Sequence, residues 1–323
     1  MKTAVITGVA GQDGSYLSEY LLKNNYTVYG ISRRKSTSSG LKNLKNSLNS
    51  VNFNLIEGDL SDSTFMSRLI MDIKPHEFYN LGAQSHVGHS FKNPIESFRT
   101  NAEAVIMHLS FIKDLSPYTR YYQASTSEMF GGVDCPVSGY NELSRLNPRS
   151  PYAIAKVAAH HSVINCRNAY GIYAVSGILF NHSSPRRGHD FATRKITSTL
   201  AKIKLGKEKF LHMGNLKAFR DEGHSKDYVE AMHMMLNNDK PTDYVVSTGD
   251  GATIEDMLKY TCNLASLNPN DIYKMNKKFM RPSDVPYLKG NSSKIATDLG
   301  WKPKYSWKEL LKDMYDNDLV KNS

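Results

Sequence analysis

A tyrosine and a lysine stand four residues apart in the segment from Ser150 to Lys156. If this segment is helical, Tyr152 and Lys156 lie on one face. An ammonium beside a phenol favours the tyrosinate and lowers the phenol pKa, so the phenolate can accept a hydroxyl proton while a hydride leaves for a nicotinamide. The pair is therefore predicted to catalyse the oxidation of an alcohol.

A carboxylate upstream of this pair indicates which type of reaction follows the oxidation. Glu128 follows Ser125, Thr126 and Ser127 at the end of an apolar stretch. Oxidation at C4 of a sugar acidifies the C5 proton, and a carboxylate can remove that proton and then protonate the departing 6-hydroxyl. Return of the hydride to C6 would complete a dehydration with no net use of cofactor. The alternative is a glutamate that only caps a loop.

Glycines near the N-terminus predict a dinucleotide site. The segment from Thr7 to Gly14 follows the first strand-like stretch and precedes an amphipathic one. Glycines permit a tight turn and close approach to a pyrophosphate at a helix N-terminus. The cofactor-binding residues predicted in this turn are Gly8, Gly11, Gln12, Asp13 and Gly14.

The residues after the second strand-like stretch indicate NADP. An NAD site usually has an acidic residue there, whereas this chain has Arg33 and Arg34, which suit the 2′-phosphate of NADP. A solvated basic loop is the alternative. Further cofactor contacts are predicted where later strands end, at Asp59, Leu60, Leu81, Ala83 and Ser85.

Alternating strand and helix patterns must position these residues. Strands are predicted from Ala4, Thr27, Phe53, Glu77, Tyr121 and Tyr173, and helices over 95–115 and 151–170. This order predicts an α/β fold, a Rossmann-type doubly wound parallel sheet with a smaller α/β C-terminal domain. We expect residues 1–180 to bind NADP and residues 181–323 mainly to bind a nucleotide sugar, with some chain returning to the first domain.

Bulk composition excludes several other classes. The 323 residues are 40% hydrophobic, enough for a sizeable core, and contain no long uncharged apolar run or signal-peptide pattern. We therefore expect a cytoplasmic protein with no membrane association. The net charge of +10 is spread along the chain, so no nucleic-acid partner is predicted. The three cysteines lack metal-ligand spacing, and no metal site is expected.

Together these motifs resemble the extended short-chain dehydrogenases, and over nearly the whole chain they resemble GDP-mannose 4,6-dehydratases. The shared motifs are TGVAGQDGSYL from Thr7, GISRR from Gly30, AQSHV from Ala83, STSEMFG from Ser125, PRSPYAIAK from Pro148, GILFNHSSPRRG from Gly177, TRKIT from Thr193, GNLKAFRDEGHSKDYVEAM from Gly214 and GWKP from Gly300.

The resemblance implies a role for each matching residue. Thr126 would orient the C4 hydroxyl, and Glu128 would serve as both base and acid, because Ser127 stands where dTDP- and UDP-sugar relatives often have Asp. His182 and Arg187 would approach NADP, as would Lys156. The residues implied to approach a GDP-linked hexose are Ser85, Asn181, Lys195, Arg220 and Arg281. The segment from Arg33 to Ser38 would reach the cofactor of a neighbouring subunit in a homotetramer, with a dimer as the alternative.

Departures from the family pattern concern the sugar. The usual Asn-His-Glu-Ser is here Asn181-His182-Ser183-Ser184, so we expect a carboxylate to be lost and space to be gained. Pro286 stands where the family commonly has Asp, and Glu96 lies near a position that often carries a cofactor-contacting Tyr. GDP-mannose, GDP-N-acetylglucosamine, as in relatives of the legionaminic acid route, and a GDP-heptose all stay open as substrates.

Two other functions are compatible with this scaffold. One is a GDP-4-keto-6-deoxysugar reductase or an epimerase, against which Glu128 argues. The other is a non-enzymatic NADP-binding protein, since a fold does not dictate a function. Such a protein would be expected to lack Tyr152, Lys156 or Glu128, and all three are present.

Overall fold

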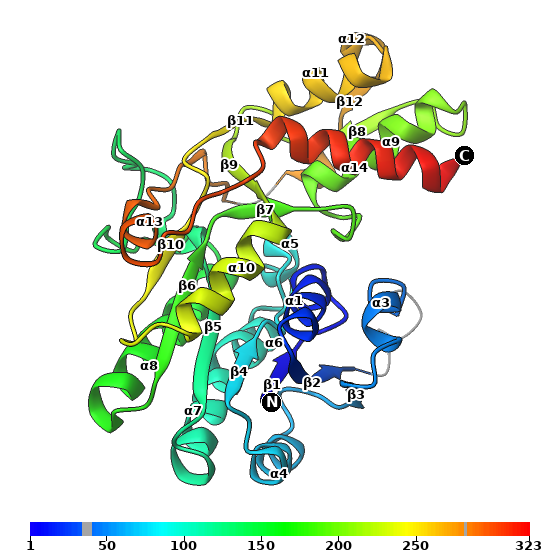
Figure 1. The fold of residues 1–323 in the computed structure, drawn as a ribbon. Coiled ribbons are helices and arrows are strands. Elements are labelled where there is room, and N and C mark those ends of the chain that lie inside the picture. Colours follow the sequence, from blue (N-terminus) through cyan, green and yellow to red (C-terminus); the bar gives the residue numbers. More distant parts are fainter. Residues whose placement is uncertain (34–40, 281–282) are drawn as a thin grey trace.

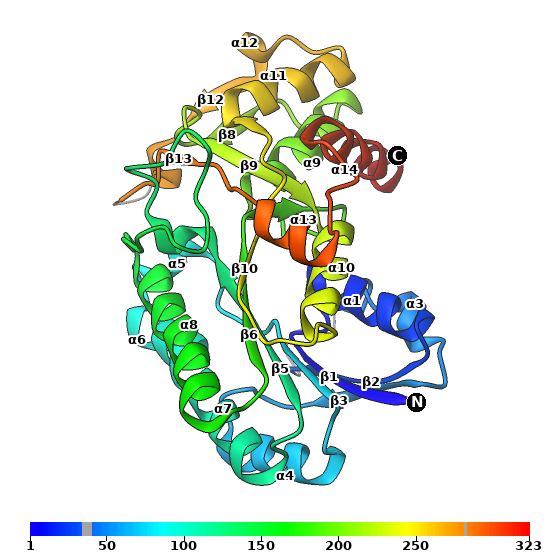
Figure 2. The ribbon, with the colours of Figure 1, turned by 60° about the vertical axis from the view of Figure 1, so that its left-hand side comes forward.

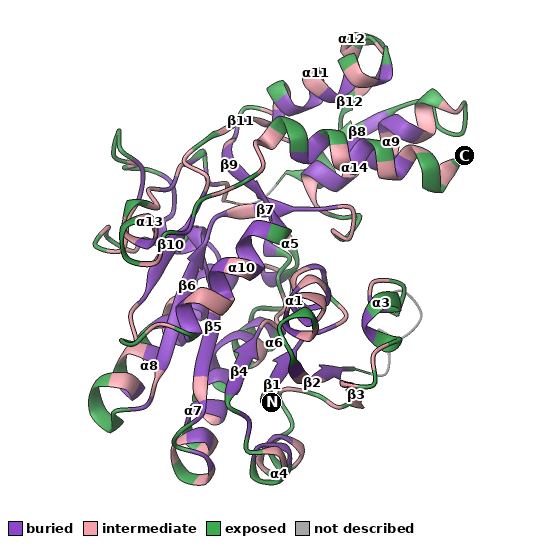
Figure 3. Ribbon diagram, in the orientation of Figure 1, coloured by how far each residue is buried: buried purple, intermediate pink, exposed green. Residues whose placement is uncertain are grey.

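The computed structural model describes residues 1–33, 41–280 and 283–323, and its centre is a seven-stranded parallel sheet (Figure 1). All six predicted strands are present, and Figure 3 shows the strands of this sheet buried along most of their length, except the edge strand β3. The strands in spatial order are β10 (Tyr244–Val246), β6 (Ala174–Leu179), β5 (Arg120–Thr126), β4 (Glu77–Asn80), β1 (Lys2–Thr7), β2 (Tyr26–Ser32) and β3 (Phe53–Glu57).

The strand order reverses between β1 and β4. The chain runs from β1 outward to β3, then crosses back to β4 and continues outward through β5 and β6. Connections from the two neighbouring strands therefore diverge at their carboxyl ends, which is where doubly wound sheets bind ligands. The predicted fold class is confirmed. The edge formed by the carboxyl ends of the strands, which we call the ligand edge, also carries the glycine turn between β1 and α1.

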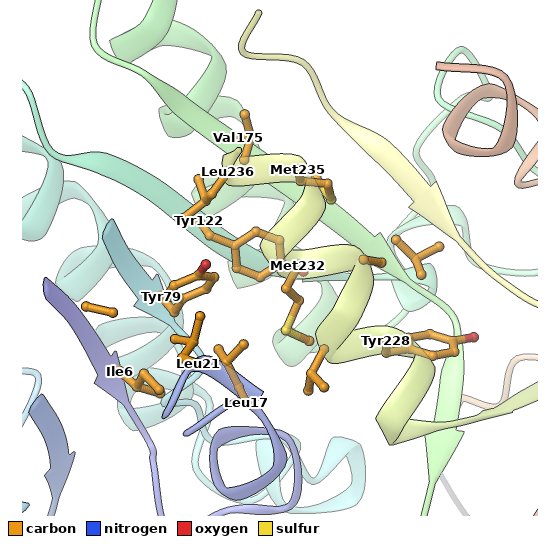
Figure 4. Packing of buried hydrophobic residues seen from close by; sticks show 14 of the residues in the cluster. Ile6, Leu17, Leu21, Tyr79, Tyr122, Val175, Tyr228, Met232, Met235 and Leu236 are labelled. Atoms are coloured by element: carbon orange, nitrogen blue, oxygen red, sulfur yellow. The ribbon is translucent and has the colours of Figure 1, made fainter. Parts of the chain in front are cut away.

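Helices cover both faces of the sheet (Figure 2). On one face, α1 (Gln12–Lys23) packs against α10 (Ser225–Leu236), and Leu17, Leu21 and Met232 are fully buried between them and the strands (Figure 4). Each such side chain stabilises the fold by about 1.5–3 kcal/mol. The first domain also contains the short helices α3 (Lys45–Leu48) and α5 (Val87–Ser90).

The opposite face is covered by α4 (Ser63–Ile73), α7 (Ala104–Leu115) and α8 (Pro151–Tyr170). The helix predicted over 95–115 begins one residue earlier and consists of α6 (Pro94–Phe98), the wider π-helical turn η2 (Arg99–Glu103) and α7. Such turns are frequent at functional sites.

A smaller α/β unit lies beyond the ligand edge. Its central strand β9 (Phe219–His224) pairs with β7 (Asn181–Ser183), β11 (Gly251–Thr253) and β13 (Tyr287–Leu288), and β8 (Leu211–Met213) pairs with β12 (Tyr273–Met275). Its core packs between helices that lie far apart in the sequence. The helices of this unit are α9 (Ala192–Lys204), α11 (Ile254–Ala265), α12 (Pro269–Ile272), η4 (Lys277–Phe279) and α14 (Trp307–Asn322).

Segments of the C-terminal half also pack on the main sheet. Besides α10, strand β10 pairs with β6, and α13 (Ser293–Leu299) lies against β10. Asp243, just before β10, binds both terminal nitrogens of Arg167 at 3.0 and 2.8 Å and accepts a 2.7 Å bond from the Ser176 amide. These contacts hold the edge strand against α8 and β6.

No helix in the described part of the chain is long and apolar enough to cross a bilayer. The predicted cytoplasmic location stays a prediction.

Replacing Asp243 should loosen the edge of the main sheet. Asp243→Ala leaves the largely buried Arg167 guanidinium without its anion, and we expect a loss of about 3 kcal/mol in the free energy of unfolding. Denaturant unfolding of the variant and of Asp239→Ala, a nearby exposed aspartate, checks this. Equal stability of the two variants would contradict the assignment.

Candidate active site

A cavity of about 910 Å³ lies between the carboxyl edge of the main sheet and the smaller unit. Cavities of this size are typical of small-molecule sites. Of the residues predicted from sequence, it is lined by Asp13, Leu81, Ala83, Ser85, Thr126, Glu128, Tyr152, Lys156, Asn181, His182, Arg187, Lys195 and Arg220. Gly8, Gly11, Gln12, Gly14, Arg33, Asp59 and Leu60 lie outside its lining, and Arg281 lies outside the described residues.

Tyr152 and Lys156 stand on the first turns of α8. Pro151 begins the helix, and the Ser150 hydroxyl accepts a 3.1 Å bond from the Ala153 amide, so the helix start is fixed by its own sequence. The Lys156 ammonium lies 5.9 Å from the centre of the Tyr152 ring and donates a 2.7 Å bond to the Ala124 carbonyl on β5. The helix thus presents both groups to the end of β5.

The expected lowering of the Tyr152 pKa is not what the protein environment produces. Burial raises the pKa of Tyr152 to about 12, and the Glu128 charge adds to this, although hydrogen bonding with Thr126 and the Arg187 charge act in the opposite direction. Burial also lowers the pKa of Lys156 to about 8. Spacing along the helix indicates the effect of the ammonium on the phenol but not the desolvation of the two groups, and desolvation determines both pKa shifts.

Thr126 and Glu128 occupy the turn that follows β5. Thr126 is the last residue of the strand, and its hydroxyl accepts a 3.3 Å bond from the Glu128 amide at the start of η3 (Ser127–Phe130). Both side chains are at least nine-tenths buried and line the cavity with Tyr152. The carboxylate and the phenol therefore share one solvent-poor space.

The glycine turn has the close backbone contacts that its sequence predicts. Gly8 has φ +67°, and a Cβ there would lie 2.8 Å from the Gly82 Cα of the loop after β4. A Cβ on Gly14 would lie 2.5 Å from the Gly8 carbonyl oxygen. Within the described residues no side chain caps the start of α1 at Gly11, so its first-turn amides can meet an anion.

His182 connects this turn to the smaller unit. Its Nδ1 lies 2.8 Å from the Phe180 carbonyl and its Nε2 lies 2.9 Å from the Asp13 carboxylate. Although burial alone would raise the pKa of Asp13, the His182 charge and hydrogen bond lower it to about 2. The imidazole therefore bridges the loop after β6 and the glycine turn through its two ring nitrogens.

Arg187 lies between the charged groups of the cavity. Its guanidinium sits 3.7 Å from the centre of the Phe191 ring, and its Nε is buried with no hydrogen-bond partner among the described residues. Asp13 and Glu222 are close enough for their charges to act on it. The guanidinium can therefore meet an anionic ligand without breaking an existing hydrogen bond.

One supporting residue was missed by the sequence analysis. Asn101, in the wider turn η2, accepts a 3.0 Å bond from the Gln84 amide and donates a 3.0 Å bond to the Gln84 carbonyl. This double contact holds the loop that carries Leu81, Ala83 and Ser85. The contact spans 17 residues, and no local pattern indicates it.

A second set of polar side chains lines the cavity on the side of the smaller unit. Lys195 sits 3.4 Å from the centre of the Phe279 ring, and Arg220 lies 3.8 Å from the Asp284 carboxylate. The Asn181 side-chain oxygen is buried without a partner in the described residues. These groups could hold the charged end of an elongated ligand.

Another strand supplies a carboxylate beside the serine at position 183. The Ser183 hydroxyl donates a 2.5 Å bond to Glu222, which lies on the neighbouring strand β9 and lines the cavity. A carboxylate is therefore present beside Ser183, although it comes from another strand. No local sequence pattern indicates this pairing, because the two residues are 39 apart.

The remaining predicted residues lie along the same sheet edge. Arg33 directly follows β2 and is exposed, while Asp59 and Leu60 follow β3. The Asp59 carboxylate accepts a 2.9 Å bond from the Ser61 amide, and the Leu60 carbonyl lies 2.8 Å from His108 Nε2. These residues lie at the ends of β2 and β3, on the side of β1 away from β4 and β5.

These features fit a bound dinucleotide. A Cβ would fill the cradle at Gly8 and Gly14, and the buried Nε of Arg187 lacks a partner among the described residues. The cradle, the cavity and the ends of β2 and β3 lie along one edge. Glycines 8, 11 and 14 would hold the pyrophosphate, and the Tyr152 region would hold the reactive ring.

Known structures share this fold. UDP-glucose 4-epimerase of Thermotoga maritima aligns with a TM-score of 0.87 over 99% of this chain and 100% of its own, at 24% identity. dTDP-glucose 4,6-dehydratase of Bacillus anthracis, in complex with NAD, aligns with a TM-score of 0.86 over 98% and 96%, at 20% identity. The chain therefore has the Rossmann-type fold of these two enzymes.

Sequence comparison narrows this class to one family. The GDP-mannose 4,6 dehydratase family profile matches residues 5–314. GDP-mannose 4,6 dehydratase 1 of Arabidopsis thaliana is 45% identical over 98% of this chain and 90% of its own, and the Homo sapiens enzyme is 41% identical over 98% and 91%. The chain belongs to the GDP-mannose 4,6-dehydratase family, which confirms the predicted resemblance.

Removing the buried ammonium should make the protein more stable. The lowered Lys156 pKa corresponds to a cost of about 3 kcal/mol at neutral pH, and loss of the bond to Ala124 offsets about 1 kcal/mol. We expect Lys156→Met to gain about 2 kcal/mol at pH 7 in denaturant unfolding.

The pH dependence of this gain follows from the direction of the shift. A base whose folded pKa is lowered destabilises the fold fully below about pH 8, and the cost disappears as the pH approaches the ordinary value of 10.5. The advantage of Lys156→Met should therefore shrink between pH 8 and 10.5. The exposed control Lys302→Met should show no such trend, and a constant advantage would contradict the assignment.

Proposed function

We propose that this protein is a GDP-sugar 4,6-dehydratase that uses NADP and releases water to form a GDP-4-keto-6-deoxy sugar. The observation that carries the proposal is that Glu128 lines the same cavity as Tyr152 and Lys156. An alcohol oxidation needs only the last two residues, whereas elimination of water also needs a group that moves a proton at C5. Family membership supports the same reaction.

The catalytic residues divide the proton transfers. Tyr152, hydrogen bonded with Thr126, takes the C4 hydroxyl proton. The Ala124 carbonyl holds the Lys156 ammonium 5.9 Å from the centre of the Tyr152 ring, where its charge favours the phenolate. When bound, oxidised NADP supplies a hydride acceptor and a positive charge that favours the phenolate. Glu128 then removes the C5 proton and protonates the departing 6-hydroxyl. With serine at position 127, Glu128 serves both transfers.

The two ends of the substrate would lie on different parts of the chain. The reacting carbons face the residues of β5 and α8, and the GDP part lies toward Asn181, Lys195 and Arg220 of the C-terminal portion. Residues 1–180 thus mainly hold NADP, and residues 181–323 mainly hold the nucleotide sugar. Both GDP-mannose and GDP-N-acetylglucosamine contain the C4 and C6 hydroxyls that this chemistry requires.

A homotetramer or a dimer is proposed for the assembly. The solvent side of the α6, α7 and α8 layer exposes Ile95, Ile106 and Ile154, each at least half exposed. Exposed apolar groups on one layer of helices favour pairing with another subunit.

The first test follows the nucleotide sugar by mass spectrometry. The protein is incubated with a catalytic amount of NADP and, separately, with GDP-mannose and GDP-N-acetylglucosamine. We expect one donor to lose one water without net formation of NADPH. Stoichiometric oxidation of NADPH with a 4-keto sugar would instead support the reductase, and loss of water from neither donor would contradict the proposal for these two sugars.

The control for this test is Glu128→Gln. The amide cannot accept the C5 proton, so water loss should fall by about 10²–10⁴-fold. Binding of GDP and NADP should be unchanged, and NADPH absorbance should rise because oxidation at C4 proceeds without hydride return. Equal loss of binding and water release would show that Glu128 is structural.

Preference for NADP is expected to depend on Arg33. Arg33→Ala should weaken NADP binding about tenfold and NAD binding little, because only NADP carries the 2′-phosphate. Dissociation constants from calorimetry check this, with the exposed Arg68→Ala as a control. An equal loss for both cofactors would mean that Arg33 does not contact the 2′-phosphate.

A further inference from the structure

Glu222 is a carboxylate of the cavity for which the proposed reaction has no use. It lies in the middle of β9, is 3% exposed and lines the cavity. The bond from the Ser183 hydroxyl, at 2.5 Å to Oε1, is its one hydrogen bond within the described residues. The second oxygen, Oε2, is left to accept a bond from a ligand.

The surroundings of Glu222 suit a carboxylate that accepts hydrogen bonds. Arg187, His182 and Arg220 are the cations whose charges act on it. Two of them are oriented by other groups, because His182 contacts Asp13 and Arg220 lies near Asp284. Burying a carboxylate without full hydrogen bonding is costly, so a ligand donor at Oε2 would be strongly favoured.

The position of Glu222 on the strand indicates which part of a nucleotide sugar it would meet. Arg220 and Glu222 are two residues apart on β9, on one face and about 6.7 Å apart along the strand. If Arg220 lies at the diphosphate on C1, Glu222 lies one step further into the cavity. Carbons C4 to C6 are assigned to Tyr152 and Glu128 by the proposed reaction, which leaves the substituents on C2 and C3. The one on C2 is adjacent to C1 and therefore nearer to Arg220.

We propose that Glu222 accepts a hydrogen bond from the C2 substituent of the GDP-linked sugar and so selects sugars with a hydroxyl or an amide N–H there. The proposal rests on the proposed function, because it takes the orientation of the sugar from that reaction. Glu222 is a specificity-determining residue and takes no part in the proton transfers. Ser183 positions its carboxylate by holding Oε1.

The experiment compares Glu222→Gln with the wild type on two sugars. One is whichever of GDP-mannose and GDP-N-acetylglucosamine the wild type dehydrates, and the other is GDP-2-deoxyglucose, which has no donor at C2. We expect kcat/KM to fall about 10–100-fold for the first sugar and less than threefold for the second. If the deoxy sugar reacts too slowly, its inhibition constant is compared instead.

A second variant separates contact with the sugar from neutralisation of Arg187. Glu222→Asp keeps a charge near Arg187 but withdraws the carboxylate by one methylene, so it should lose activity on the first sugar as Glu222→Gln does. Dissociation constants for GDP and NADP should stay within twofold of the wild type for both variants. Normal activity of Glu222→Asp, or equal losses on both sugars, would overturn the proposal.

The failure of this inference is distinguishable from that of the proposed function. A wild type that releases no water from either sugar contradicts the reaction itself. A wild type that dehydrates one of them, with variants that show no dependence on the C2 substituent, contradicts only the role of Glu222.

Discussion

The pairing of His182 with Asp13 is the contact on which the cavity depends. It ties the turn after β1 to strand β7, and the ion pair between Arg186 and Glu19 joins the same two parts of the molecule. Buried charges of this kind are stable only when each has a partner, because desolvation otherwise outweighs the attraction. The positions of Arg187 and Glu222 beside this pair follow from the same requirement.

Burial shifts the pKa values of the two residues proposed to act in the oxidation in opposite directions. It raises the pKa of Tyr152 to about 12 and lowers that of Lys156 to about 8, so the protein environment favours the neutral form of each. Formation of the phenolate therefore needs positive charge in addition to that of Lys156. A site of this kind links the proton acceptor to the presence of an oxidised, cationic cofactor ring.

The sequence predicted those features that depend on neighbouring residues. The glycine turn, the six strands and helix α8 each follow from a local pattern, and all are present in the structure. Contacts between distant segments were not predictable in this way. The Asn101 contacts with Gln84 and the bond from Ser183 to Glu222 join segments 17 and 39 residues apart, and the pKa of Tyr152 depends on burial by the whole fold.

The two walls of the cavity are built differently, and this separates reactivity from selectivity. Glu128 stands in η3, directly after β5, and Tyr152 stands on the first turn of α8, and the side chains of Thr126 and Ser150 cap the starts of η3 and α8. Another part of the lining comes from the paired strands β7 and β9, where Ser183 of one strand binds the carboxylate of Glu222 on the other. Under the proposed function, substitutions on that strand pair would change the sugar that is bound without moving the proposed proton-transfer groups. The serine at position 183 is therefore best considered together with Glu222, since the two side chains are hydrogen bonded to each other.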